Sequence, residues 1–235
     1  MQERHWTAET ITIEEAAKFI DHSLLRPELT VTDVQAGCET AMKYGVASVC
    51  CRPIDVPLCV RELAGTGVVV GTVVGFPHGS HTTATKVAET RRAIDDGARE
   101  FDMVIPIGML RSGRYREVHD DIAAVVDAAA AVDGVVKVIL ETAFLTKEEK
   151  IQGAKLAEEA GAAFVKTSTG FAPSGATVED VELLRSAVSP KVKVKAAHGI
   201  RTLDVFLQMI NAGADRVGAT ATSRILDDLR ARKGV

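Results

Sequence analysis

Several features are scarce or absent in this 235-residue sequence. Aromatic residues make up only 4% of the chain, and no apolar run approaches the roughly 20 residues that span a bilayer. The net charge is −4, and no long block of like charges occurs that could attract a nucleic-acid backbone. We therefore expect neither a membrane nor a nucleic acid as a partner.

Cysteine motifs and nucleotide-binding loops are also missing. The four cysteines form no CxxC pair and have no histidines at metal-binding spacing, and neither GxGxxG nor GxxxxGK[ST] occurs. The segment from Met1 to Trp6 lacks the apolar core of a signal peptide. These absences predict a cytoplasmic protein with reduced thiols and no zinc, disulfide or dinucleotide site; the thiols are Cys38, Cys50, Cys51 and Cys59.

Apolar runs of strand length recur along the whole chain and alternate with amphipathic segments. The runs are Phe19-Ile20, 46–51, 68–76, 101–107, 135–140, 162–165, 192–197 and 216–219. The amphipathic segments are 32–44, 56–64, 83–96, 115–132, 147–160, 178–187, 203–211 and 223–232. Strand and helix thus alternate eight times, which predicts a TIM (β/α)8 barrel rather than an open doubly wound sheet.

Local signals agree with this division. A threonine followed three residues later by an acid predicts a helix start, and a glycine between a helix and the next strand predicts a left-handed helix end. The segment 12–18 is an added helix before the first strand, and no linker interrupts the series, so we expect one domain over 1–235. The threonine–acid pairs are Thr12/Glu15, Thr146/Glu149 and Thr177/Asp180, and the glycines are Gly45, Gly97, Gly161 and Gly213.

Lys166 is the residue best placed for covalent chemistry. It ends the apolar run that begins at Ala162 and precedes a polar loop. Burial and a neighbouring cation disfavour the ammonium form of lysine, and a neutral amine can attack a carbonyl. Lys195, in the next strand, can be that cation. The pair predicts Schiff-base catalysis, with two ordinary surface lysines as the alternative.

Asp102 lies inside an apolar strand, where a carboxylate needs a cation. Lys166 and Lys195 are its candidate partners, and Asp102 with Lys195 can relay protons for the imine steps; a purely structural ion pair is the alternative. Other polar residues close the strands of such barrels at the active-site end, among them Asp21, Ser23 and Cys50. Ser168 has the strand parity of Lys166 and can bind substrate hydroxyls.

Seven short strings of residues resemble deoxyribose-phosphate aldolases, and they occur in the order typical of that family, over about residues 11–228. They are Ile20-Asp21-His22-Ser23-Leu24-Leu25, Ala47-Ser48-Val49-Cys50, Gly75-Phe76-Pro77-His78-Gly79, Phe101-Asp102-Met103-Val104, Lys137-Val138-Ile139-Leu140-Glu141-Thr142, Phe164-Val165-Lys166-Thr167-Ser168-Thr169-Gly170-Phe171 and Val194-Lys195-Ala196.

The resemblance implies a TIM barrel that needs no metal or cofactor and is often a homodimer. It implies a reversible cleavage of 2-deoxy-D-ribose 5-phosphate into acetaldehyde and D-glyceraldehyde 3-phosphate, with a Schiff base on Lys166 assisted by Lys195 and Asp102. We assign substrate contacts to Asp21, Ser23, Cys50, Thr167, Ser168, Gly170, Gly199, Gly218 and Thr220.

The phosphate end departs from the family pattern. Gly170, Gly199 and Gly218 remain, so backbone amides can approach an anion, and His198 can add a charged donor. Two serine-like positions have become alanine or histidine, however, as in Ala197-His198-Gly199. An aldolase with the same lysine chemistry and a non-phosphorylated or different sugar is therefore the alternative function.

Further alternatives concern other residues and other classes of barrel. Lys137 shares strand parity with Glu141 and can be its buried partner, and Lys193 needs a carboxylate if it faces the barrel interior. A barrel isomerase or synthase using an imine, and a non-catalytic regulatory barrel, are the remaining readings. A regulatory barrel without catalytic activity would not require two strand-end lysines together with Asp102.

Overall fold

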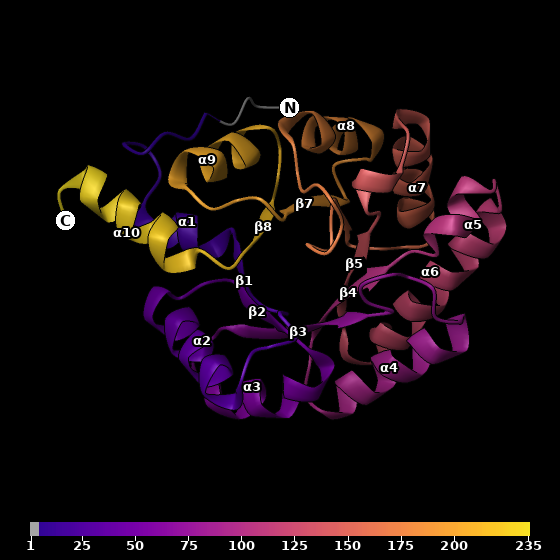
Figure 1. The fold of residues 1–235 in the computed structure, drawn as a ribbon, viewed down its shortest axis with the longest axis horizontal. Coiled ribbons are helices and arrows are strands. Elements are labelled where there is room, and N and C mark those ends of the chain that lie inside the picture. Colours follow the sequence, from indigo (N-terminus) through magenta and orange to yellow (C-terminus); the bar gives the residue numbers. More distant parts are fainter. Residues whose placement is uncertain (1–4) are drawn as a thin grey trace.

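Eight parallel strands close into a barrel in the computed structural model, which describes residues 5–235 (Figure 1). Each strand pairs with the next in the sequence, and the last pairs with the first, which confirms the predicted TIM barrel. The strands are β1 (Ile20–Leu24), β2 (Ser48–Cys51), β3 (Val69–Val74), β4 (Glu100–Val104), β5 (Val135–Ile139), β6 (Phe164–Lys166), β7 (Lys193–Ala197) and β8 (Arg216–Ala219).

Helices surround the barrel and connect its strands. The connecting helices are α2 (Val31–Tyr44), α3 (Val56–Glu62), α4 (Thr83–Asp95), α5 (Ile107–Arg111), α6 (Tyr115–Ala129), α7 (Lys147–Glu159), α8 (Val178–Ala187) and α9 (Leu203–Asn211), and α10 (Thr222–Lys233) follows β8. Short 3-10 helices cover Pro53–Asp55, Ala130–Val132 and Thr142–Phe144. The predicted helix before β1 is present as α1 (Ile13–Lys18), which packs against α10.

Two boundaries differ from the sequence prediction. Of the run Phe19-Ile20, Phe19 caps the end of α1 and Ile20 begins β1, which continues through three polar residues to Leu24 because alternate residues face the barrel interior. The run 101–107 does not form one strand: β4 ends at Val104, and α5 begins at Ile107 after Pro106. Apolar periodicity cannot separate these two elements, since both are buried at the junction.

Most of the predicted helix ends are confirmed. The pairs Thr12/Glu15 and Thr146/Glu149 form reciprocal capping boxes, and all four predicted glycines have positive φ. Thr177 caps α8, but Asp180 does not complete a box; its carboxylate accepts a hydrogen bond from Lys150 instead, at 2.6 Å.

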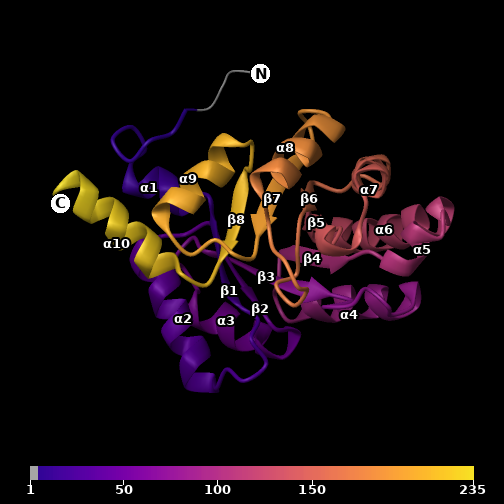
Figure 2. The same cartoon turned by 45° about the horizontal axis from the view of Figure 1, so that its top comes forward.

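The hydrophobic core lies between the barrel and the helices. Outward-facing strand residues such as Val138, Val165 and Val217 belong to it, and Figure 2 shows the helices that cover them. The inward-facing residues include the buried charged side chains, together with apolar residues such as Val104, Ile139 and Phe164 and a small cluster around Cys50 and Val73. No helix within residues 5–235 is long and apolar enough to cross a membrane.

Candidate active site

The barrel interior gathers the predicted catalytic residues. Lys166 on β6 and Lys195 on β7 are register partners in neighbouring strands, and both side chains are almost fully buried. Each Nζ lies 2.7 Å from the same oxygen, Oδ2 of Asp102 on β4. The structure therefore brings two lysines and one carboxylate into direct contact at the positions that the sequence indicated.

The two lysines differ in their other partners. Nζ of Lys195 also lies 2.5 Å from Oδ2 of Asp21 on β1, whereas Asp102 is the carboxylate within hydrogen-bond distance of Lys166. Burial lowers the pKa of Lys166, and the positive charge of Lys195 lowers it further against the opposing pull of Asp102. Burial also disfavours the charged form of Lys195, but Asp102 and Asp21 together raise its pKa. Lys166 is thus the lysine whose neutral form is favoured.

A wider ion network surrounds this pair. Lys137 on β5 donates to Glu100 at 2.6 Å and to Asp102 at 2.9 Å, and Arg216 on β8 donates to Asp21 at 2.6 Å. Burial alone would raise the pKa of Asp102, but Lys137, Lys166 and Lys195 hold it well below its usual value.

Charge balance in this network bears on the nucleophile. Apart from Lys166, it holds three cations and three carboxylates. The sum is therefore zero when Lys166 is a neutral amine, and the network needs no further counter-ion. The cations are Lys137, Lys195 and Arg216, and the carboxylates are Asp21, Glu100 and Asp102.

The prediction that Lys137 pairs with Glu141 is wrong. Four residues of extended strand span about 13 Å, which is too far for a direct ion pair. Lys137 instead contacts carboxylates on the neighbouring strand β4 and, across the barrel, Asp21 on β1. Lys193 is exposed at the start of β7, with its Nζ 5.6 Å from the centre of the Phe164 ring.

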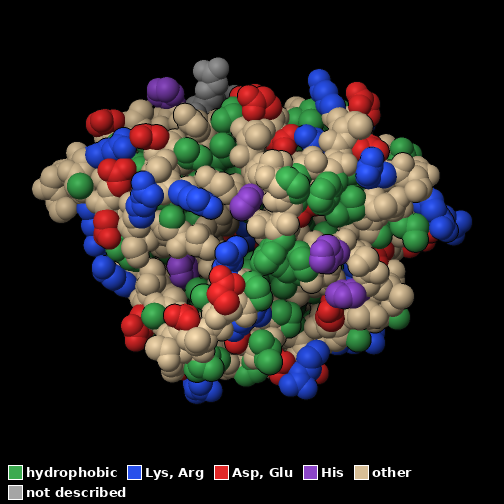
Figure 3. Space-filling model, viewed as in Figure 1, with side chains coloured by type: hydrophobic (Ala, Val, Ile, Leu, Met, Phe, Trp, Pro, Cys, Tyr) green, Lys and Arg blue, Asp and Glu red, His purple; other side chains and the backbone are tan. Residues whose placement is uncertain are grey.

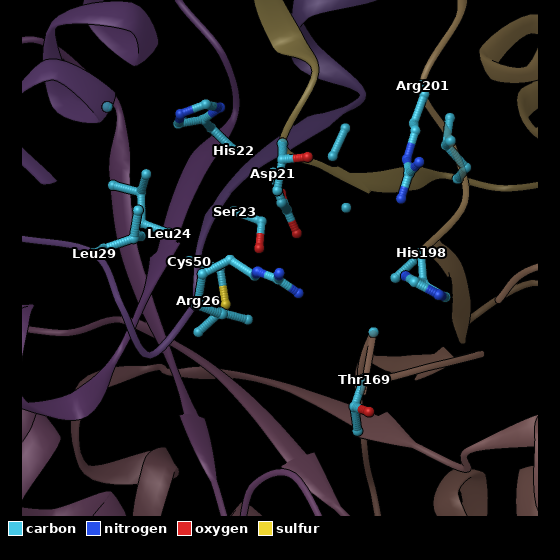
Figure 4. Close-up of a pocket in the computed structure, with 18 of the residues that line it drawn as sticks. Asp21, His22, Ser23, Leu24, Arg26, Leu29, Cys50, Thr169, His198 and Arg201 are labelled. Atoms are coloured by element: carbon cyan, nitrogen blue, oxygen red, sulfur yellow. The ribbon is translucent and has the colours of Figure 1, made fainter. Parts of the chain in front are cut away.

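A cavity of about 600 Å³ opens at the C-terminal ends of the strands and reaches both lysines. Figure 4 shows Ser23, Cys50 and Arg26 on one side of it and Thr169 and His198 on the other. Most of the predicted substrate contacts line this cavity: Asp21, Ser23, Cys50, Gly170, Gly199, Gly218 and Thr220. Burial and the nearby Asp102 raise the pKa of the Cys50 thiol to about 11, so the thiol stays protonated.

Two predicted contacts do not line the cavity. Thr167 faces away from the barrel interior, and its hydroxyl is bonded to the backbone of Ala197, as donor at 3.3 Å and as acceptor at 3.1 Å. Ser168 is fully buried, and its Oγ has no hydrogen-bond partner among the described residues. Strand parity predicted that Ser168 faces the same side as Lys166, but β6 ends at Lys166 and Ser168 is not among the residues that line the cavity.

Sequence reasoning missed Thr169, which does line the cavity. Its hydroxyl donates to Glu141 and accepts a hydrogen bond from the backbone N–H of Phe171 at 3.1 Å. Glu141 has a positive φ of 58°, a rare conformation for a residue other than glycine, and burial raises the pKa of its carboxyl. Such contacts depend on the path of a loop, which apolar periodicity does not report.

The loops after β6, β7 and β8 form the other end of the cavity. Gly170 and Gly199 have φ values of 95° and 86°, and His198 between β7 and Gly199 also has a positive φ, 71°. Arg201 extends toward His198 in Figure 4, and both line the cavity. Figure 3 shows Lys, Arg and His side chains near the centre of the molecular face that is seen in the view of Figure 1. These groups suit an anion.

The remaining histidines have local partners or face solvent. Nδ1 of His22 lies 2.8 Å from Oγ1 of Thr222, and burial lowers the pKa of His22 to about 4. His78 and His81 are exposed in the loop after β3. Within residues 5–235 no group of three or more His, Cys, Asp or Glu side chains could hold a metal ion.

A closed barrel with a buried lysine of lowered pKa at the end of β6 and a second lysine beside it is typical of an aldolase of the Schiff-base class. A family model described as DeoC/LacD family aldolase matches residues 14–229. The chain belongs to this family.

The relatives and the structural neighbour described next are all named deoxyribose-phosphate aldolases. The chain is 51% identical over 213 residues to a deoxyribose-phosphate aldolase of Staphylococcus epidermidis, covering 91% of this chain and 96% of the relative. It is 50% identical over 216 residues to one of Thermococcus gammatolerans, covering 91% and 96%. The tetrameric deoxyribose phosphate aldolase of Aeropyrum pernix superposes with a TM-score of 0.87 at 29% identity, covering 95% of this chain and 94% of that one.

Proposed function

We propose that this enzyme reversibly cleaves 2-deoxy-D-ribose 5-phosphate into acetaldehyde and D-glyceraldehyde 3-phosphate through a Schiff base on Lys166. The observation that carries the proposal is the shared contact of Lys166 and Lys195 with Asp102 beside the cavity. The family and the names of the relatives support the choice of substrate.

The chemistry begins with the neutral amine of Lys166, which attacks C1 of the open-chain sugar to give a carbinolamine. Loss of water yields an iminium. A base then removes the proton of the C3 hydroxyl, the C3 oxygen becomes a carbonyl, and the C2–C3 bond breaks with its electrons passing to the iminium. Protonation of the resulting enamine at C2 and hydrolysis release acetaldehyde and restore the amine.

Asp102 and Lys195 are the groups that we assign to proton transfer in these steps. The Asp102 carboxylate is ionised and touches both lysines, so it can accept a proton close to the imine and return it. Lys195 stabilises the negative charge that develops on the reacting oxygen of the substrate. Asp21 holds Lys195 in its charged form by direct contact.

A second candidate is the same reaction on a non-phosphorylated sugar. It is favoured by the loop sequence Ala197-His198-Gly199, in which His198 has a positive φ and lies among the glycines of the anion end, the end of the cavity formed by the loops after β6, β7 and β8. Comparing kcat/KM for deoxyribose with and without its 5-phosphate separates the two. If deoxyribose 5-phosphate is the substrate, its kcat/KM should clearly exceed that of deoxyribose, and inorganic phosphate should compete with it.

Borohydride trapping tests the Schiff base itself. Incubation with acetaldehyde and borohydride should add one two-carbon group to the peptide that contains Lys166, and the variant Lys166→Met should not be labelled. Absence of label on the wild-type enzyme would refute the covalent mechanism. Activity on deoxyribose 5-phosphate without label would point to a different chemistry.

We also propose that the enzyme is a cytoplasmic homodimer and that residues 1–235 form one cooperative domain. The unbroken series of βα units supports the single domain. Sedimentation at micromolar concentration tests the dimer against the tetramer reported for the Aeropyrum pernix enzyme. A single unfolding transition in calorimetry is expected.

A further inference from the structure

Two charged residues of the network lie at the starts of their strands. Arg216 is the first residue of β8, and Glu100 is the first residue of β4, so both stand at the N-terminal ends of their strands. Neither lines the cavity. Nη2 of Arg216 lies 3.1 Å from Oε2 of Glu100, and the Arg216 side chain is 15% exposed. The pair closes the network at the end of the barrel opposite the active site.

Arg216 connects to the nucleophile through two carboxylates and one lysine. Its Nε donates to Oδ1 of Asp21 at 2.6 Å, and the other oxygen of Asp21 contacts Lys195 at 2.5 Å. Lys195 in turn shares Oδ2 of Asp102 with Lys166. All these contacts are direct, and the groups between Arg216 and Lys166 are almost fully buried, where charges are screened little.

Glu100 connects by a second route. Its Oε2 accepts from Lys137 at 2.6 Å, and Lys137 donates to Oδ1 of Asp102 at 2.9 Å. Asp102 therefore lies where the two routes meet, with one oxygen facing Lys137 and the other facing Lys166.

We propose that Arg216 and Glu100 are positioning residues that set the charge state of Lys166 from the opposite end of the barrel. The inference rests on the proposed Schiff-base function. Arg216 favours the neutral amine because it adds a positive charge to the network, and Glu100 favours the ammonium form because it adds a negative one. With both residues present, the charges of the network sum to zero when Lys166 is a neutral amine.

Other charged or titratable groups also surround Lys166, and each must stay unchanged in a test. They come from five strands and two loops: Asp21 on β1, Cys50 on β2, Asp102 on β4, Lys137 on β5, Lys195 on β7, Glu141 after β5 and His198 after β7. Substituting Arg216 or Glu100 changes none of these residues. A shift in the titration of Lys166 then reports the substituted charge.

The experiment compares Arg216→Gln, Glu100→Gln and the double variant. The titration of Lys166 is followed by 13C NMR of lysine labelled at Cε, with the signal assigned by its loss in Lys166→Met, and by the acidic limb of kcat/KM. A unit charge about 10 Å away at an effective dielectric constant near 20 shifts a pKa by roughly one unit. We expect Arg216→Gln to move the titration upward and Glu100→Gln downward, each by about half a unit to one unit, and the double variant to return close to wild type.

A matched control uses a buried ion pair outside the barrel. Nζ of Lys86 on α4 lies 2.6 Å from Oδ2 of Asp121 on α6, and neither residue belongs to the network. Asp121→Asn should lower the melting temperature without moving the titration of Lys166. A structural disturbance alone predicts that all single variants behave like this control.

Shifts of the same sign in Arg216→Gln and Glu100→Gln, or no shift in either, would overturn the inference. Because each single variant tests one sign, the proposal stays testable if one of them does not fold. Arg216→Lys, which keeps the charge, should restore the wild-type titration. The NMR titration does not depend on turnover, so failure of the borohydride test would refute the proposed function and leave this result to stand separately.

Discussion

The two ends of the cavity are built in different ways. At the lysine end, side chains from strands that are not adjacent in the barrel contact one another directly, and Asp21 and Asp102 each contact a charged lysine. At the opposite end, the loops after β6, β7 and β8 present mainly backbone at positive-φ residues, together with Arg201 and His198. The lysine end is thus built from strand side chains, and the opposite end is built from loops.

The largest expected effect sharpens the first half of this comparison. Lys166→Arg keeps the positive charge but cannot become a neutral nucleophile, so kcat/KM should fall by at least about a thousandfold with the fold retained. Steady-state kinetics and circular dichroism measure the two outcomes. Near-normal turnover by this variant would refute the assignment of Lys166.

Lys195→Leu should have the next largest effect. Removing the like charge beside Lys166 raises the pKa of that lysine, and since only the neutral amine reacts, activity at neutral pH falls and the acidic limb of kcat/KM moves to higher pH. We expect a loss of about a hundredfold at pH 7. An acidic limb that does not move would show that Lys195 has no influence on the nucleophile.

Two glycine substitutions contrast the ends directly. A Cβ at Gly218 would meet Ala197 Cβ at 3.1 Å and Lys195 Cε at 3.4 Å, so Gly218→Ala should lower kcat for phosphorylated and free sugars alike. A Cβ at Gly199 meets no atom within 4 Å, but φ is +86°, so Gly199→Val should distort only the loop. KM for the phosphorylated sugar should then rise about tenfold, with little change for the free sugar. Equal effects of Gly199→Val on both sugars would contradict an anion site in this loop.

The smallest effect is expected at His198. His198→Gly removes a side chain from the anion end. It also removes the strain of a positive φ, which costs a residue other than glycine about 1 kcal/mol or more. KM for the phosphorylated sugar should rise about threefold, and the melting temperature should stay equal or increase. A lower KM would mean that His198 obstructs the phosphate, which favours the non-phosphorylated substrate.

The lysine end could be predicted from the sequence to a large extent, because strand order in a βα series fixes which residues are neighbours. The parity of Lys166, Lys195 and Asp102 then places them on one face. Arg216 and Glu100 were not predicted to join the network, because both lie at strand starts and the prediction considered only the residues that end each strand. The predicted partner of Lys137 was wrong because parity along one strand ignores contacts with the neighbouring strand, here with Glu100 and Asp102 on β4.

The loop end could be predicted only in part. Gly170 and Gly199 were found by residue type, but Thr169, Glu141 and Arg201 owe their places to the path of the chain between elements. Short helices within apolar runs are equally hard to detect, as α5 shows. Such features depend on tertiary contacts that no local pattern encodes.

The division of each strand into outward apolar and inward polar residues has a consequence for how the protein can change. Val165 and Lys166 are adjacent in β6, yet one packs under the helices and the other faces the barrel interior. Substitutions on the outer face change the packing against the helices and leave the charges around Lys166 in place, whereas those on the inner face change these charges directly. A designer or natural selection can therefore reach the packing of the shell and the electrostatics of the interior at positions one residue apart.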